Sequence, residues 1–136
     1  MTLVCDASVV FGALDRRDRS HRRCAELLIE ASRTVIPAPV LVEIDWLASS
    51  RGVRDAVDRV LQSADDRSML IVDLDEEDYR RVRELLRRYA DLPLDLVDAS
   101  VVATAERLEQ GTIATLDRRH FSVVQPAHLP AFTLVP

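Results

Sequence analysis

The segment TLVCDASVVFGALD, residues 2–15, decides the fold class that the sequence predicts. Its apolar run at 2–5 ends at Asp6, and a helical pattern follows over 7–15, so we expect a short strand and then a helix. The same order recurs along the chain. Short strands are expected at 34–36, 68–72, 112–116 and 131–136, with helices over about 18–31, 39–52, 53–64, 76–90 and 94–111.

Short strands that alternate with helices favour an α/β fold, specifically a three-layer α/β/α sandwich with a central parallel sheet. The length of 136 residues fits a single domain over 1–136. We interpret 68–72 as a buried strand, Asp75 as the cap of the helix that follows it, and Gly111 as the stop of the helix before 112–116. In such sheets a ligand lies beyond the carboxyl ends of the strands.

The composition excludes several function classes. All 18 basic residues are Arg, and the absence of Lys excludes P-loop phosphate sites and Schiff-base enzymes. No stretch approaches the length of a membrane span, and two Cys without metal spacing fit a cytoplasmic protein. The net charge of −5 hides two basic segments, 16–23 and 80–88, each with five Arg and one acid.

Four acidic residues stand where a carboxylate needs a partner. Asp6 and Asp117 each directly follow a predicted strand, whereas Glu43 and Asp98 lie in helices rich in apolar residues. Asp95 lies one turn before Asp98. Carboxylates beside packing residues are costly unless they are paired or bind a metal, and clustered carboxylates repel one another. A hard divalent cation such as Mg²⁺ would resolve this. Taken one at a time, Asp6 and Asp98 also fit helix N-caps, and Asp117 fits a turn.

Four segments in this order resemble the PIN-domain nucleases, specifically the VapC-type toxins. They are VCDAS (4–8), PAPVLVEIDWL (37–47), LPLDLVDASVVATAERL (92–108) and TIATLDRRHF (112–121), so that the resemblance extends over nearly the whole length of the chain. The resemblance implies an α/β/α sandwich with endoribonuclease activity that depends on Mg²⁺ or Mn²⁺. It also implies a homodimer, neutralised by a cognate VapB-type antitoxin.

Residue by residue, the acidic positions of the family correspond to Asp6, Glu43, Asp98 and Asp117. Ser8 matches a family Ser or Thr that hydrogen-bonds in the site, although it also fits an ordinary residue at a helix start. Asp95 is a looser match, as an alternative or supporting ligand. His120 departs from the pattern, because many relatives have an acidic or amide residue before Phe121.

As a mechanism we expect the four acids to hold one or two divalent ions that activate water for in-line attack on an RNA phosphodiester. Arg118 and Arg119, with the two basic segments, are candidates for contact with the RNA backbone, although charged helix faces are often only solvated. Trp46 is expected in the core or in a dimer interface. The alternative function is a non-catalytic PIN-like module that binds RNA or a partner protein. A receiver-like domain needs a Lys, and a haloacid-dehalogenase site needs DxD after the first strand; neither is present.

Overall fold

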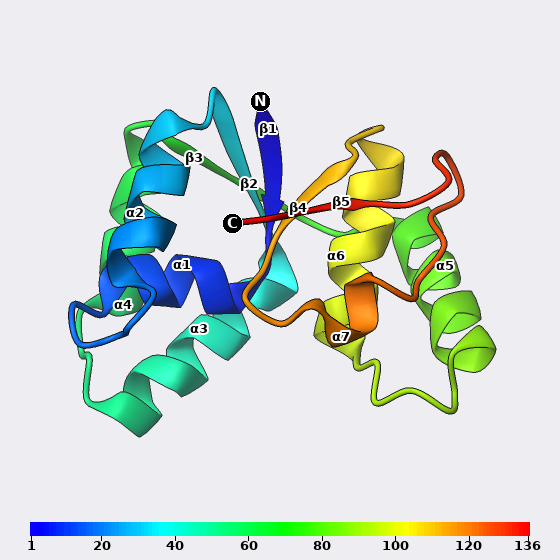
Figure 1. Ribbon diagram of the computed structural model, residues 1–136, viewed down its shortest axis with the longest axis horizontal. Helices are drawn as coiled ribbons and strands as arrows, with labels where there is room; N and C mark the ends of the chain where they lie inside the picture. The colour runs from blue at the N-terminus through cyan, green and yellow to red at the C-terminus, as the bar shows by residue number, and fades with distance from the viewer.

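The computed structural model describes all residues, 1–136, as an α/β fold with a central sheet and helices on both of its faces (Figure 1). The strands are β1 (Thr2–Cys5), β2 (Arg33–Pro37), β3 (Met69–Val72), β4 (Thr112–Ala114) and β5 (Thr133–Val135). The helices are α1 (Ala7–Leu14), α2 (His21–Glu30), α3 (Ala38–Arg51), α4 (Ala56–Asp65), α5 (Glu76–Arg88), α6 (Leu96–Arg107) and α7 (Arg118–Phe121). The α/β/α architecture predicted from the alternation of strands and helices is confirmed.

All five strands are parallel, in the order β3-β2-β1-β4-β5. Strand β1 lies at the centre, and its Leu3, Val4 and Cys5 are completely buried. Strand β3 lies at an edge with β2 as its only neighbour, so its side chains stay partly accessible and Leu70 is 38% exposed. The prediction of a buried strand at 68–72 was therefore wrong about its burial, because an apolar run alone does not reveal the order of the strands.

The connections reverse direction at β1. From β1 the chain steps outward to β2 and then β3, and from β3 it crosses back over the sheet to β4 on the other side of β1. Right-handed crossovers then require helices on opposite faces. Accordingly, α1–α4 lie on one side of the sheet and α5–α7 on the other (Figure 1). The point of reversal lies between β1 and β4, where open α/β sheets bind ligands beyond the carboxyl ends of the strands.

The end of α6 differs from the expectation. Helix α6 ends at Arg107, because Glu109 adopts a left-handed conformation with φ 53° and the Gln110 N–H donates to the Ala105 carbonyl. Gly111 is therefore not the stop that the sequence indicated. Helix α3 does end at Gly52, whose φ of 71° favours glycine. The short helix α7 was not predicted, and its four residues are too few for a periodic pattern.

Trp46 does not lie in the core. Its side chain is 67% exposed on α3, and Val42, one turn earlier, is 73% exposed. The prediction that Trp46 packs in the core is therefore wrong, whereas its place in a dimer interface stays a prediction. No helix of the structure is long and apolar enough to cross a membrane.

Helix α5 is fixed to α6 through a buried carboxylate. Asp75 caps α5 as predicted, and it forms a capping box with Asp78 in which each side chain accepts the backbone N–H of the other. Asp78 is only 3% exposed and also accepts from Arg107 Nε of α6 at 2.9 Å. This ion pair ties the end of α6 to the start of α5.

Replacing Asp78 with Ala should lower the free energy of unfolding by about 2–3 kcal/mol, because it removes a cap and leaves Arg107 without its buried partner. Urea unfolding followed by circular dichroism measures this change. Glu77→Ala, an exposed acid in the same turn, is the control and should change it by less than about 0.5 kcal/mol. Equal effects of the two substitutions would show that the buried pair does not secure α5.

Candidate functional site

A cavity of about 530 Å³ lies beyond the carboxyl ends of β1 and β4, where the sequence and the sheet topology predicted a site. Six carboxylates contribute to its wall, against the cationic or basic side chains of Arg51 and His120 only. The lining residues are Asp6, Ser8, Phe11, Asp18, Glu43, Leu47, Arg51, Pro93, Asp95, Asp98, Leu116, Asp117 and His120. All four acids predicted as ligands, together with Asp95 and Ser8, are among them.

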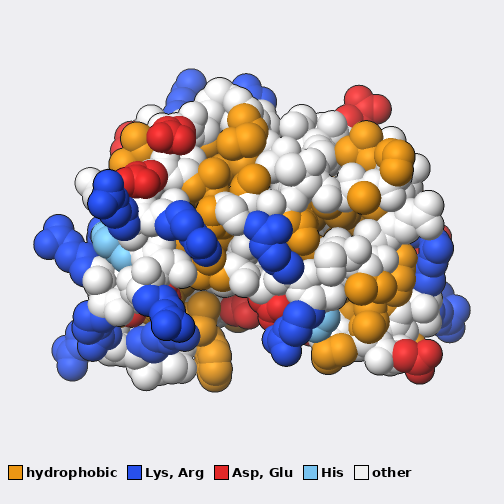
Figure 2. Space-filling model, in the orientation of Figure 1, with side chains coloured by type: hydrophobic (Ala, Val, Ile, Leu, Met, Phe, Trp, Pro, Cys, Tyr) orange, Lys and Arg blue, Asp and Glu red, His pale blue; other side chains and the backbone are white.

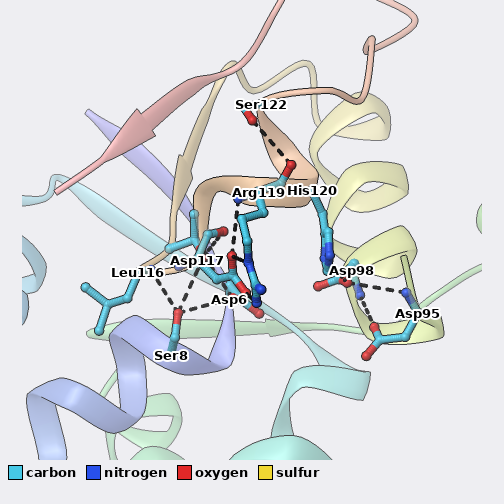
Figure 3. A network of polar contacts seen from close by, with 10 residues as sticks. Asp6, Ser8, Asp95, Asp98, Leu116, Asp117, Arg119, His120 and Ser122 are labelled. Carbon is cyan, nitrogen blue, oxygen red and sulfur yellow. Dashed lines mark hydrogen bonds and ion pairs between the residues drawn. The ribbon is translucent and has the colours of Figure 1, made fainter. Parts of the chain in front are cut away.

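Asp6 is the most deeply placed of these acids, and hydroxyl groups hold its carboxylate (Figure 3). Its backbone N–H donates to the Ala114 carbonyl at 2.9 Å, which joins the end of β1 to the end of β4. Its Oδ2 accepts from Thr115 Oγ1 at 2.9 Å and from Ser8 Oγ at 3.2 Å. Burial raises the pKa of Asp6, whereas the bond from Thr115 acts in the opposite direction. Asp6 does precede α1, but its side chain accepts no capping hydrogen bond from that helix.

Ser8 connects two segments of the site. While its Oγ donates to Asp6, it accepts the Leu116 N–H at 2.9 Å from the turn after β4. The Asp117 N–H is bound to Thr115 Oγ1 at 3.1 Å in the same turn. These bonds fix the turn that carries Asp117 against the start of α1. They support a positioning role for Ser8 near Asp6.

Asp95 and Asp98 form the capping box of α6. Asp95 is the N-cap and accepts the Asp98 N–H at 2.9 Å, while Asp98 Oδ2 accepts the Asp95 N–H at 3.3 Å. The N-cap of this helix is thus Asp95, and Asp98 is the third helical residue. Burial and the charge of Asp95 raise the pKa of Asp98 to about 6.

His120 is the partner of Asp98. Its Nδ1 lies 3.1 Å from Asp98 Oδ2, and Figure 3 shows the ring directed from α7 toward α6. This contact acts against the rise in the Asp98 pKa. At the position where many relatives have an acidic or amide side chain, this protein therefore places an imidazole on one of the candidate ligands.

Glu43 enters the cavity from α3, a helix on the opposite side of the sheet from α6 (Figure 1). It is half-buried and makes no ion pair or side-chain hydrogen bond in the structure. Burial raises its pKa to about 7, with the charges of Asp6, Asp95 and Asp98 adding to the shift. The repulsion expected among clustered acids is therefore present, and it acts on both Glu43 and Asp98.

Asp117 is not free, in contrast to the expectation of unpaired carboxylates. Arg119 Nη2 lies 2.7 Å from its Oδ2, and Arg119 Nε donates to Oδ1 at 3.0 Å. This guanidinium lowers the pKa of Asp117 to about 2. Arg118 points elsewhere and donates to the Pro136 carbonyl. Arg119 was a candidate for contact with the RNA backbone, and in the structure its guanidinium binds Asp117.

Four residues of the site were not predicted to belong to it: Thr115, His120, Asp18 and Arg51. Thr115 could have been found, because it follows β4 as directly as Asp6 follows β1. The contact of His120 with Asp98 spans 22 positions, and that of Thr115 with Asp6 spans 109, so neither is visible in local patterns. Arg51 was not singled out from the sequence.

The donor set fits a hard divalent cation, since the carboxylates of Asp6, Glu43 and Asp98 supply oxygen atoms and repel one another without a cation. As the side chains are placed, no three His, Cys, Asp or Glu groups converge closely enough to enclose a metal ion. Binding a cation therefore requires the carboxylates to rotate toward one another.

Comparisons with known proteins identify the family to which the chain is similar. The family model of the PIN domain matches residues 3–125. The chain is 27% identical over 135 residues to Ribonuclease VapC26 of Mycobacterium tuberculosis. The aligned residues cover 98% of this chain and all of that protein. The sarcin–ricin loop cleaving toxin VapC20 of the same species has a similar structure, with a TM-score of 0.81 and 16% identity over 96% of this chain and 99% of that one.

Two solved assemblies are also similar in fold. A toxin–antitoxin complex from Klebsiella pneumoniae gives a TM-score of 0.68 with 17% identity, over 95% of this chain and 98% of that one. VapBC2 from Rickettsia felis, bound to a DNA fragment from its promoter, gives 0.65 with 18% identity, over 98% and 97%.

The raised pKa values predict that the metal-free protein loses stability as the pH rises. Glu43 and Asp98 titrate near 7 and 6 in the folded chain and near their ordinary values of 4.5 and 3.8 when it unfolds. The folded chain thus binds more protons between about pH 4 and 7, and the free energy of unfolding falls across that window. The lowered pKa of Asp117 acts only below this window.

Urea unfolding in the presence of a chelator, at pH 5 and pH 8, measures this loss. Glu43→Gln should remove a large part of it, whereas the control Asp45→Asn, an exposed acid on the same helix, should not. A wild-type protein that is equally stable at both pH values would contradict the proximity of these carboxylates.

Proposed function

The chain belongs to the PIN-domain family, and from that membership and its acidic cavity we propose that it is a metal-dependent endoribonuclease, the toxin of a toxin–antitoxin pair. The observation that carries the proposal is the convergence of Asp6, Glu43 and Asp98 from three separate elements on one cavity. The likeness to Ribonuclease VapC26 along nearly the whole chain supports the same activity.

The proposed site holds Mg²⁺, or Mn²⁺, through Asp6 and Asp98, with Glu43 and Asp117 as further ligands and Asp95 as a weaker candidate. When bound, the ion supplies a Lewis acid that lowers the pKa of water and stabilises charge on the phosphate. Ser8 and Thr115 keep the Asp6 carboxylate oriented. Cleavage by attacking water leaves a 5′-phosphate and a 3′-hydroxyl.

Each side chain has a distinct task in this proposal. Asp95 holds the N-terminus of α6 and so positions Asp98. Glu43 has no partner within the protein, so its carboxylate is free to turn toward the cation. Arg119 is mostly exposed beside Asp117, and it can exchange that carboxylate for a phosphate oxygen when Asp117 turns toward the cation.

We further propose a VapB-type antitoxin as the protein partner. A cavity rich in carboxylates fits a cationic side chain of such a partner, and some of the solved relatives are toxin–antitoxin complexes. A homodimer is the expected assembly of the toxin itself. The exposed apolar pair Val42 and Trp46 on α3 is a candidate surface for one of these contacts.

The second candidate is a PIN-like module that binds RNA without cutting it. Its supporting observation is that Asp117 is paired with Arg119 and Asp98 with His120, so that two of the four acids are engaged by side chains of the protein itself. The presence of all four acids favours the enzyme.

Replacing Asp98 with Asn should reduce RNA cleavage at least about 100-fold, because a neutral amide binds a hard cation poorly and no longer stabilises the transition state through it. Cleavage of a labelled RNA in the presence of Mg²⁺ or Mn²⁺ measures this loss, and a chelator should abolish the wild-type activity. Asp45→Asn is the control and should keep that activity. Wild-type protein that binds RNA but never cuts it with either metal would establish the module instead.

Replacing both Arg118 and Arg119 with Glu should weaken RNA binding and make it less dependent on salt, because phosphate contacts release counterions when they form. Fluorescence anisotropy at several salt concentrations, with Ca²⁺ in place of Mg²⁺, measures both effects. An unchanged affinity together with an unchanged salt slope would exclude these arginines from the RNA interface.

A further inference from the structure

Arg51 is the only arginine on the wall of the acidic cavity. The other basic group there, His120, is engaged by Asp98 at 3.1 Å. The neighbouring Arg119 is occupied by two contacts to Asp117. Arg51 is thus the one cationic side chain of the cavity that is not paired with an acid of the proposed metal site.

Its place on α3 puts it at a distance from those acids. Glu43, Leu47 and Arg51 are four residues apart and line the cavity from one face of the helix. The rise of an α-helix separates the backbone of Arg51 from that of Glu43 by about 12 Å along the axis. Along about two turns of α3, the cavity wall is therefore lined first by a carboxylate and then by a guanidinium.

The guanidinium of Arg51 is positioned but has free donors. It lies 5.4 Å from the centre of the Phe11 ring, and its Nη1 is 3.6 Å from Asp18 Oδ2, an ion pair too long for a hydrogen bond. Asp18 is itself fixed by the Ser20 N–H at 2.8 Å. The Arg51 side chain remains 50% exposed.

Arg17 contacts the backbone of Arg51. Its Nη2 donates to the Arg51 carbonyl, 2.5 Å away, and its Nε is bound to the buried Asp15 at 3.3 Å. These contacts hold the loop between α1 and α2 against the end of α3. In Figure 2, red side chains lie low in the centre of this face, between groups of blue ones on either side.

We propose that Arg51, whose backbone Arg17 holds in place, binds a phosphate of the RNA strand next to the one that is cut. A planar guanidinium with free donors can bind two oxygens of one phosphate. The acids around Arg51 repel the negatively charged RNA, so binding of the strand at this cavity depends on a cationic side chain. The separation from Glu43 assigns Arg51 to a flanking phosphate and not to the reacting one. This inference rests on the proposed ribonuclease function and specifies how its site holds the substrate.

The test measures binding first. With Ca²⁺ in place of Mg²⁺, a labelled single-stranded RNA of 12 nucleotides should bind Arg51→Gln about tenfold more weakly than wild type, and the salt slope should fall by about 0.7. Arg51→Lys keeps the charge without the planar fork and should lie between the two. The matched control is Arg33→Gln, which removes the same charge at the start of β2, away from the carboxyl ends of the strands where the cavity lies, and should match the wild type.

Steady-state cleavage with Mg²⁺ separates this role from catalysis. Arg51→Gln should raise KM with little change in kcat, since a flanking contact is made equally in the ground and transition states. If Arg51→Gln binds RNA like Arg33→Gln, Arg51 only neutralises Asp18 and the inference is overturned. Wild-type protein that binds RNA without cutting it contradicts the ribonuclease alone and leaves the binding comparison decisive. If the wild type neither binds nor cuts RNA, both proposals are overturned.

Discussion

Repulsion among carboxylates that share one partly buried cavity is the constraint on which the rest of this structure depends. The end of β1, the helix α3 and the start of α6 each bring one acid to the same cavity, where burial and neighbouring charges hold Glu43 partly protonated near neutral pH. Such an arrangement costs stability, and a fold retains it where the charges have a use. The proposed use is to bind a divalent cation that offsets the repulsion and reacts with a phosphodiester.

Side chains of the protein itself offset part of this repulsion. Asp98 is paired with His120, and Asp117 is paired with Arg119. Asp6 accepts hydrogen bonds from two hydroxyl groups, so that of these four acids only Glu43 has no partner. Helix α3 carries both Glu43 and, two turns later, Arg51. One element therefore contributes an acid for the proposed cation and a guanidinium for the substrate, and the tie between Arg17 and the Arg51 carbonyl holds its end in place.

Local patterns predicted the elements well, because apolar runs and caps such as Asp75 and Gly52 act within a few residues. They also identified the acids, since Asp6 and Asp117 follow strands and Glu43 lies among apolar neighbours. The exposure of β3 was missed because it depends on strand order. The contacts of Thr115 with Asp6 and of His120 with Asp98 were missed because they join segments far apart in the chain. Both are consequences of topology, which brings the ends of β1 and β4 and the start of α6 together.

The most direct test of this account is the release of protons when Mg²⁺ binds. If the cation replaces protons held by Glu43 and Asp98, titrating the metal-free protein with Mg²⁺ in weak buffer should release protons between about pH 6 and 7 and almost none above pH 8. Glu43→Gln should release fewer, and the exposed Asp45→Asn as many as wild type. Mg²⁺ that binds without releasing protons at pH 6.5, or that does not bind at all, would contradict the claim that this cluster is built around a divalent cation.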